Sequence, residues 1–255
     1  MRRSILLLCC LFGLFARSAD ASGPNVDDCW TSLNQVTKQV QKLAAAGDYA
    51  RAASLYSLAL PACTGLEDKN IKAHVKAAED FGRLDSAWEL AAKDPAAAAS
   101  ALVQFVLLAP PGDRYVSVSE LHALISRLEP LVPNLPKKIT HALQFSVEIR
   151  SKSSSNSNLE PTIFTNELVD VLSQLGGTPH LASESALTIS FEYVSPGEAN
   201  ASVKLISDPA TVKYVFAVTS DRRSSVDAAK CLANAVVCHL LARILADLGI
   251  PAKLP

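Results

Sequence analysis

The chain has 255 residues, of which 19% are charged and 6% aromatic, with 24 lysines and arginines against 25 aspartates and glutamates. This near balance of charge offers no argument for binding nucleic acid or an acidic membrane surface. The length predicts one or two domains with ample apolar material for a core, and the abundant alanine with few aromatics favours packed helices over an all-β sandwich.

Residues 1–21 have the pattern of a cleavable secretory signal peptide. Two arginines precede the short apolar run 5–15, and Ala19 and Ala21 occupy the −3 and −1 positions of a cleavage site. The apolar run is too short to cross a bilayer of about 30 Å as a helix. We therefore predict a periplasmic or secreted protein with no integral membrane span after cleavage. An uncleaved membrane anchor is the alternative.

The stretch 29–63 predicts two helices joined by a turn at Gly47-Asp48-Tyr49, because small and apolar residues recur around it at helical spacing. Antiparallel helices of similar length bring Cys29 and Cys63 to the same end of the hairpin. A disulfide needs Cα atoms about 5.5 Å apart, and an exported chain meets an oxidising compartment. We therefore predict a Cys29–Cys63 disulfide, with two unpaired surface thiols as the alternative.

Residues after the turn carry a family resemblance. Counted from Gly47, the small, aromatic, small and leucine positions of a tetratricopeptide repeat are occupied by Ala52, Tyr56, Ala59 and Leu60. The hairpin thus resembles one unit of that repeat, although Thr64 replaces its closing proline. A second, less complete copy begins 35 residues later, with Gly82 in the place of Gly47. Two further helices are expected over 95–108 and 119–128.

The repeat resemblance implies a binding surface. In such repeats the first helix of a unit lines a groove that holds a peptide, and the residues at the contacting positions here are Asn34, Thr37 and Gln41. The resemblance therefore implies that these three side chains contact a protein partner. The alternative is that they simply face water, because a lone repeat makes a poor groove.

The pattern changes after a proline-rich stretch. Residues 130–139 are expected to link a helical domain, 22–129, to an α/β domain, 140–255. In the second domain, apolar and polar residues alternate, as in half-buried strands, near 145–149, 187–193, 201–205 and 212–218. Helical spacing returns over 164–175 and 225–248. The predicted fold class is α+β: a helical-repeat-like bundle followed by a β-α-β-β-β-α sandwich, with two helices on one face of a mostly antiparallel sheet.

This element order, with Asp208 and Thr211 in a turn before the last strand, resembles a known periplasmic domain. It is the α/β domain shared by curli-secretion lipoproteins, the TolB amino-terminal domain and the lipoprotein activators of penicillin-binding proteins. The resemblance implies a module that binds envelope proteins without catalysis. A generic α+β sandwich is the alternative.

The sequence contains no nucleophile elbow, phosphate-binding loop, zinc-binding His-Glu-x-x-His motif or dinucleotide-binding fingerprint. Cys238 and His239 are adjacent, but neighbours on a helix point about 100° apart and do not face each other. Glu148 and Glu192 are expected on solvated strand faces. No cofactor or metal is predicted. The sequence favours a non-enzymatic adaptor of the cell envelope with protein partners; an exported enzyme acting on a cell-wall or sugar substrate and a small-ligand carrier remain as alternatives.

Overall fold

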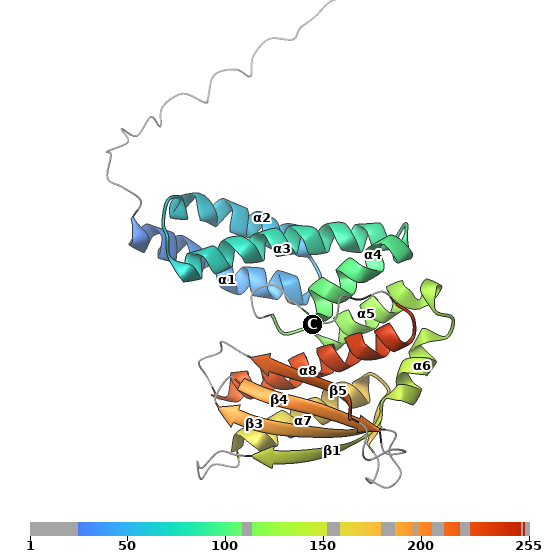
Figure 1. Ribbon diagram of the computed structural model, residues 1–255. Helices are drawn as coiled ribbons and strands as arrows, with labels where there is room; N and C mark the ends of the chain where they lie inside the picture. The colour runs from blue at the N-terminus through green and yellow to red at the C-terminus, as the bar shows by residue number, and fades with distance from the viewer. Residues whose placement is uncertain are drawn as a thin grey trace, which may run out of the picture.

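In a computed structural model of the chain, helix α1 (Val26–Ala45) and helix α2 (Tyr49–Ala59) form the hairpin that the sequence predicts (Figure 1). Asn25 and Asp48 cap the two helices, each accepting a backbone N–H from the first turn. Gly47 closes the turn between them with φ +76°, a left-handed conformation that glycine adopts at little cost because it has no Cβ.

Much of the chain is described by the structure. The predicted signal peptide and the predicted turn containing Asp208 and Thr211 lie outside the described residues. The described residues are 25–108, 114–151, 159–179, 187–195, 198–205, 212–219, 225–250 and 252.

Helix α3 (Lys69–Ala91) follows the 3-10 turn η1 (Leu60–Cys63) and is capped by Asp68, whose side chain accepts two backbone N–H groups. Gly82 lies in the interior of α3, so the predicted second turn at this residue is wrong. A single glycine costs a helix only about 1 kcal/mol relative to alanine, which the flanking helix-forming and buried residues readily offset. The second repeat copy therefore has no hairpin at the predicted position.

The rest of the first half is also helical. Helix α4 (Pro95–Leu102) runs directly into a π-helical segment, η2 (Val103–Leu108), so one continuous helical stretch occupies the predicted range 95–108. Helix α5 (Val118–Leu128) and the 3-10 turn η4 (Glu129–Leu131) come next. Helix α6 (Leu135–Ala142) then occupies the second half of the predicted linker, with Leu135 at its start buried in the core.

The second half contains a five-stranded sheet in the order β2-β1-β3-β4-β5. Its strands are β1 (Gln144–Ser151), β2 (Thr178–Pro179), β3 (Leu187–Ser195), β4 (Glu198–Leu205) and β5 (Val212–Thr219). The β3–β4 and β4–β5 pairs are antiparallel. The β1–β2 and β1–β3 pairs are parallel, because the chain leaves β1 through a helix and re-enters the sheet in the same direction.

Helix α7 (Leu159–Gln174) makes that crossover, and helix α8 (Ser225–Asp247) follows the last strand. Helix α8 packs against α7 and β5 on one side and against η2 on the other, so it lies between the first-half helices and the sheet (Figure 1). By length and composition alone, its Ala229–Asp247 part is long and apolar enough to cross a membrane, a criterion that the buried core helix of a folded domain also meets. In the folded protein, 67% of that segment is buried.

The residues described with their side chains belong to a helical protein, and the predicted α+β sandwich class is wrong. Of the residues described with their side chains, 81% lie in helices, and a single core cluster joins buried residues of both predicted domains. The sheet is mixed rather than mostly antiparallel. The core is helical because α8, which is mostly apolar, packs against helices of both halves. That the two halves fold separately stays a prediction.

Candidate protein-binding surface

A disulfide closes the open end of the first hairpin. Cys29 lies in the first turn of α1 and Cys63 ends η1, with their Cα atoms 4.7 Å apart and both side chains buried. The sequence prediction of this bond is confirmed. Because η1 extends α2 by one turn, the staple ties the start of the first helix to the end of the second.

A groove of about 520 Å³ lies beside this staple, between η1, the loop after it and the start of α3. Leu60, Leu66 and Ile71 supply much of its aliphatic wall, and the Lys72 side chain adds a cation. Val75 also lines the groove and leaves 38% of its surface exposed. A concave surface with exposed aliphatic carbon is suited to receive a side chain of another molecule.

Aromatic and hydrogen-bonding side chains join the three helices around the groove. The Tyr56 hydroxyl of α2 lies 3.3 Å from Nδ1 of His74 on α3. The Trp30 ring meets the His74 ring edge-on with centroids 6.2 Å apart. Burial lowers the pKa of His74, which favours the neutral imidazole. These contacts hold α1 and α3 on α2 and so give the groove fixed walls.

The three residues predicted to contact a partner lie on α1, but they do not share one environment. Asn34 and Gln41 are exposed. Thr37 is half-buried and donates a 2.7 Å hydrogen bond to the Leu33 carbonyl, so its hydroxyl serves packing within the hairpin. None of the three lines the groove beside the staple. The sequence missed that groove because its wall is made by residues of η1 and α3 that carry no motif.

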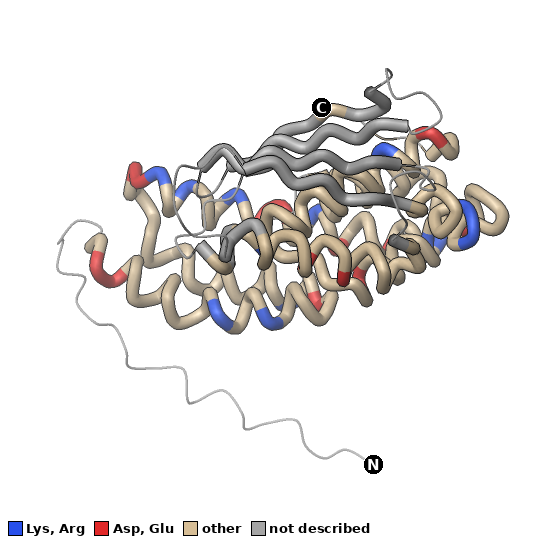
Figure 2. Tube along the Cα trace, turned by 90° about the horizontal axis from the view of Figure 1, so that it is seen from below, with Lys and Arg blue, Asp and Glu red and all other residues tan. Residues whose placement is uncertain are grey.

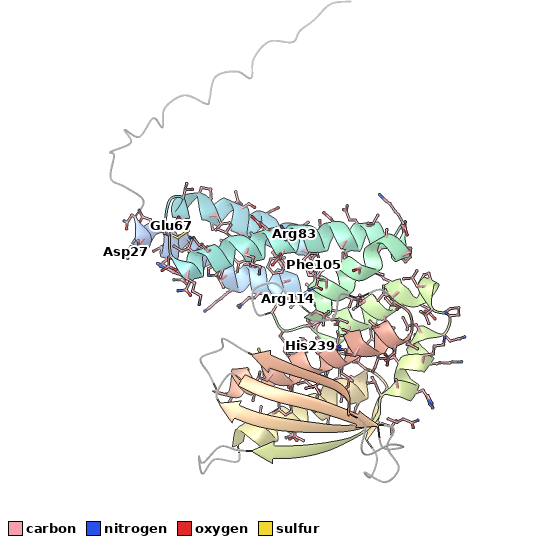
Figure 3. All side chains as sticks on the ribbon, viewed as in Figure 1. Asp27, Glu67, Arg83, Phe105, Arg114 and His239 are labelled. Atoms are coloured by element: carbon pink, nitrogen blue, oxygen red, sulfur yellow. A yellow bond between two sulfur atoms is a disulfide. The ribbon has the colours of Figure 1, made fainter. Side chains whose placement is uncertain are left out.

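A second polar cluster lies at the junction of the two halves. Nη1 of Arg114 is 2.5 Å from both carboxylate oxygens of Glu120, and their side chains are only 5% and 4% exposed. The guanidinium lies over the Tyr49 ring, 5.4 Å from its centroid. Burial raises the pKa of Glu120 and lowers that of Arg114. Figure 3 labels Arg114 between the first-half helices and α8.

Asn234 of α8 completes this junction. Its side-chain amide accepts from the Val116 N–H and donates to the Val116 carbonyl, both at 2.9 Å. The short segment 114–117 is therefore clamped between α8 and the first-half helices. The only sequence signal for this role is Asn234 itself, one amide in a mostly apolar helix, which does not identify its partner.

The geometry of the junction is that of a buried structural contact. A shifted glutamate pKa is a common property of enzyme sites, but Glu120 is buried and both its oxygens are bound by Arg114. The Cys238 thiol is fully buried beside Asn234, and burial raises its pKa to about 12, so it stays protonated and is a poor nucleophile. Among the described residues, no three histidine, cysteine, aspartate or glutamate side chains are placed to bind a metal ion.

The chain was also compared with known proteins. No protein-family model, curated protein or solved structure matches it.

Proposed function

We propose that this chain is an exported, non-enzymatic adaptor of the cell envelope that binds a segment of another protein in the groove beside the Cys29–Cys63 disulfide. The observation that carries the proposal is the groove itself, whose aliphatic wall reaches the surface at Val75. Each apolar Å² that a partner removes from water contributes roughly 25 cal/mol to binding. A single inserted aliphatic side chain would therefore supply a useful part of the affinity.

The rigidity of the groove supports this proposal. Cys63 lies in its wall, and the disulfide fixes that wall to α1. The contact of Tyr56 with His74 fixes the start of α3 in the same way. A site with fixed walls loses little conformational entropy on binding, which favours affinity.

Export and the role of the second half belong to the same proposal. Residues 1–21 have the pattern of a signal peptide, and a disulfide persists in the oxidising compartments that exported proteins reach. We expect the mature chain to begin at Ser22. The resemblance of the second half to periplasmic α/β domains suggests that it docks a second envelope protein.

The competing functions receive less support. An enzyme would need an accessible reactive group, whereas the most strongly shifted carboxyl, that of Glu120, is buried in an ion pair. A small-ligand carrier would need an enclosed apolar pocket between the two halves, whereas the described groove lies on the outer end of the hairpin. These observations therefore favour the adaptor function.

The test is site-specific photocrosslinking in the native cells. A benzoylphenylalanine at Val75 should yield one reproducible crosslinked protein, identified by mass spectrometry. Leu90 is the matched control, because it is also exposed and lies on the same helix outside the groove. The Leu90 variant should not yield that product. Equal products from both positions, or none above background from Val75, would refute the adaptor proposal. N-terminal sequencing of the exported chain tests cleavage before Ser22.

A further inference from the structure

Only one cysteine of the disulfide borders the groove. Cys63 lines it together with Thr64 and Gly65, whereas Cys29 does not line it and is fully buried. Thiol–disulfide exchange requires that a thiolate reach one of the two sulfurs, and access decides which sulfur it attacks. The groove is therefore the side from which a small thiol can reach this bond, and Cys63 is the residue that it meets.

Charge does not close the groove to a thiolate. Of the described residues that line it, Lys72 is the only charged one, and its ammonium group forms an ion pair with Glu67. Elsewhere on the described helices, acidic and basic positions are interspersed (Figure 2). Because no carboxylate is among the described lining residues, shape rather than charge decides what reaches Cys63.

The segment that carries Cys63 depends on the disulfide for its place on α1. The N–H groups of Thr64 and Leu66 donate to the carbonyls of Pro61 and Cys63, at 3.3 and 3.2 Å, so these bonds stay within the segment. Among the described residues, no backbone hydrogen bond joins residues 60–66 to α1. The disulfide is thus the covalent link between this wall of the groove and α1, and without it apolar packing has to hold the segment there.

From this arrangement we propose that the Cys29–Cys63 disulfide is a redox switch of the groove: a dithiol reductant reaches Cys63 through the groove, and reduction releases η1 from α1 and weakens binding of the partner. This inference rests on the proposed adaptor function and adds its regulation.

The reduction proceeds in two exchange steps. The first thiolate of the reductant bonds to the Cys63 sulfur as the bond between Cys63 and Cys29 breaks, and Cys29 leaves as a thiolate that takes up a proton. The second thiol of the reductant then loses its proton and displaces Cys63, which is protonated in turn. Two electrons and two protons thus convert the disulfide to two thiols, and the reductant is oxidised to its own disulfide.

Occupancy of the groove acts back on this switch. A partner side chain in the groove covers the approach to Cys63, so the bound chain should be reduced more slowly. Because linkage is reciprocal, a partner that binds the oxidised chain more tightly also makes its disulfide harder to reduce. If the released segment keeps the shape of the groove in about one molecule in ten, the apparent affinity for the partner falls about tenfold.

Reduced glutathione, a monothiol, tests the route of attack. The mature chain is incubated with it without denaturant and quenched with acid, and mass spectrometry of tryptic peptides locates the adduct. The two cysteines fall in different peptides, because Lys38 and Arg51 lie between them. We expect glutathione on Cys63 and a free thiol on Cys29. Adducts in equal amounts on both cysteines would overturn the inference.

A bulky side chain in the groove supplies the matched comparison. Val75→Trp adds an indole to the groove wall and should slow formation of the Cys63 adduct several-fold. Leu90→Trp, on the same helix outside the groove, should react at the wild-type rate. Both positions are exposed, so both variants should fold, which circular dichroism checks. Equal rates in all three proteins would mean that the bond opens only through unfolding, and would overturn the inference.

Photocrosslinking from Val75 measures the effect on the partner. Adding Cys29→Ala/Cys63→Ala to the benzoylphenylalanine chain should lower the crosslink yield about tenfold. Circular dichroism should show that the helices remain. An unchanged yield would refute the switch and leave the adaptor proposal intact. An unfolded variant would also refute it, because a switch needs a folded reduced state. No crosslink from the oxidised chain would refute the adaptor proposal, and the glutathione adduct would still report whether the groove gives access to Cys63.

Discussion

The buried Arg114–Glu120 pair predicts that removing one charge costs far more than removing both. Glu120→Gln leaves the guanidinium, which is 5% exposed, without a counter-charge in a site that water does not reach. Breaking a buried pair in this way typically costs about 3–5 kcal/mol. A domain of ordinary stability has a free energy of unfolding of about 5–15 kcal/mol, so this loss would be a large share of it.

The double variant Arg114→Met/Glu120→Leu should behave differently. It removes both charges and replaces them with apolar side chains of comparable size, so the desolvation cost of each charge disappears with the attraction between them. Such replacements are commonly neutral or stabilising. We expect its free energy of unfolding to lie within about 1 kcal/mol of the wild type or above it, which gives a coupling energy of several kcal/mol.

Urea unfolding of the mature chain at pH 7, followed by circular dichroism, measures these values. Arg83→Met is the control, because Arg83 forms ion pairs with Glu79 and Asp80 while its own side chain is 60% exposed. That variant should lose less than about 1 kcal/mol. A loss below about 1 kcal/mol for Glu120→Gln would mean that burial keeps the carboxyl protonated and that the pair is not ionic. Additive single variants would refute the coupling.

Three further predictions concern the hairpin and the junction. Replacing Cys29 and Cys63 by serine should lower the free energy of unfolding by about 4 kcal/mol, the loop-entropy value for a separation of 34 residues, and a loss under about 1 kcal/mol in urea unfolding would contradict it. Burial lowers the pKa of His74 below 6.5 in the folded protein. The stability that the neutral imidazole contributes is therefore present above pH 6.5 and is lost as the pH falls through the folded-state pKa. His74→Asn should therefore flatten the fall in the urea midpoint between pH 7 and 5, and an unchanged slope would refute this. Asn234→Ala should cost about 2–4 kcal/mol in the same assay, because it leaves the buried Val116 N–H and carbonyl unpaired, and full stability would show that other groups satisfy them.

Local signals predicted the hairpin and its disulfide. Gly47 and Asp48 specify the turn through conformational freedom and capping, and α2 together with η1 then brings Cys63 back beside Cys29 at the start of α1. The alternating segments likewise form strands along the backbone. In each case, the information lies within a few residues of the feature, which is why a sequence pattern suffices.

Features that depend on distant contacts were missed or predicted wrongly. Asn234 and Val116 are separated by 118 residues, and neither carries a local pattern that points to the other. Gly82 resembled a turn, but packing of α3 decides its conformation. The sandwich class failed because alternation along strands does not reveal that α8 also packs against helices of the first half. The groove was missed because it exists only when η1 and α3 meet.

The position of α8 has a consequence for the order in which the protein is made. This helix is the last described element of the chain, yet it contacts both the first-half helices and the sheet. All the described elements before α8 are therefore synthesised before the shared core is able to close, because contacts so distant in sequence form late. Until α8 is made, the residues of η2 that pack against it lack that contact. A chain that stays open during synthesis is compatible with the export that we propose, and it exposes apolar surface that favours aggregation.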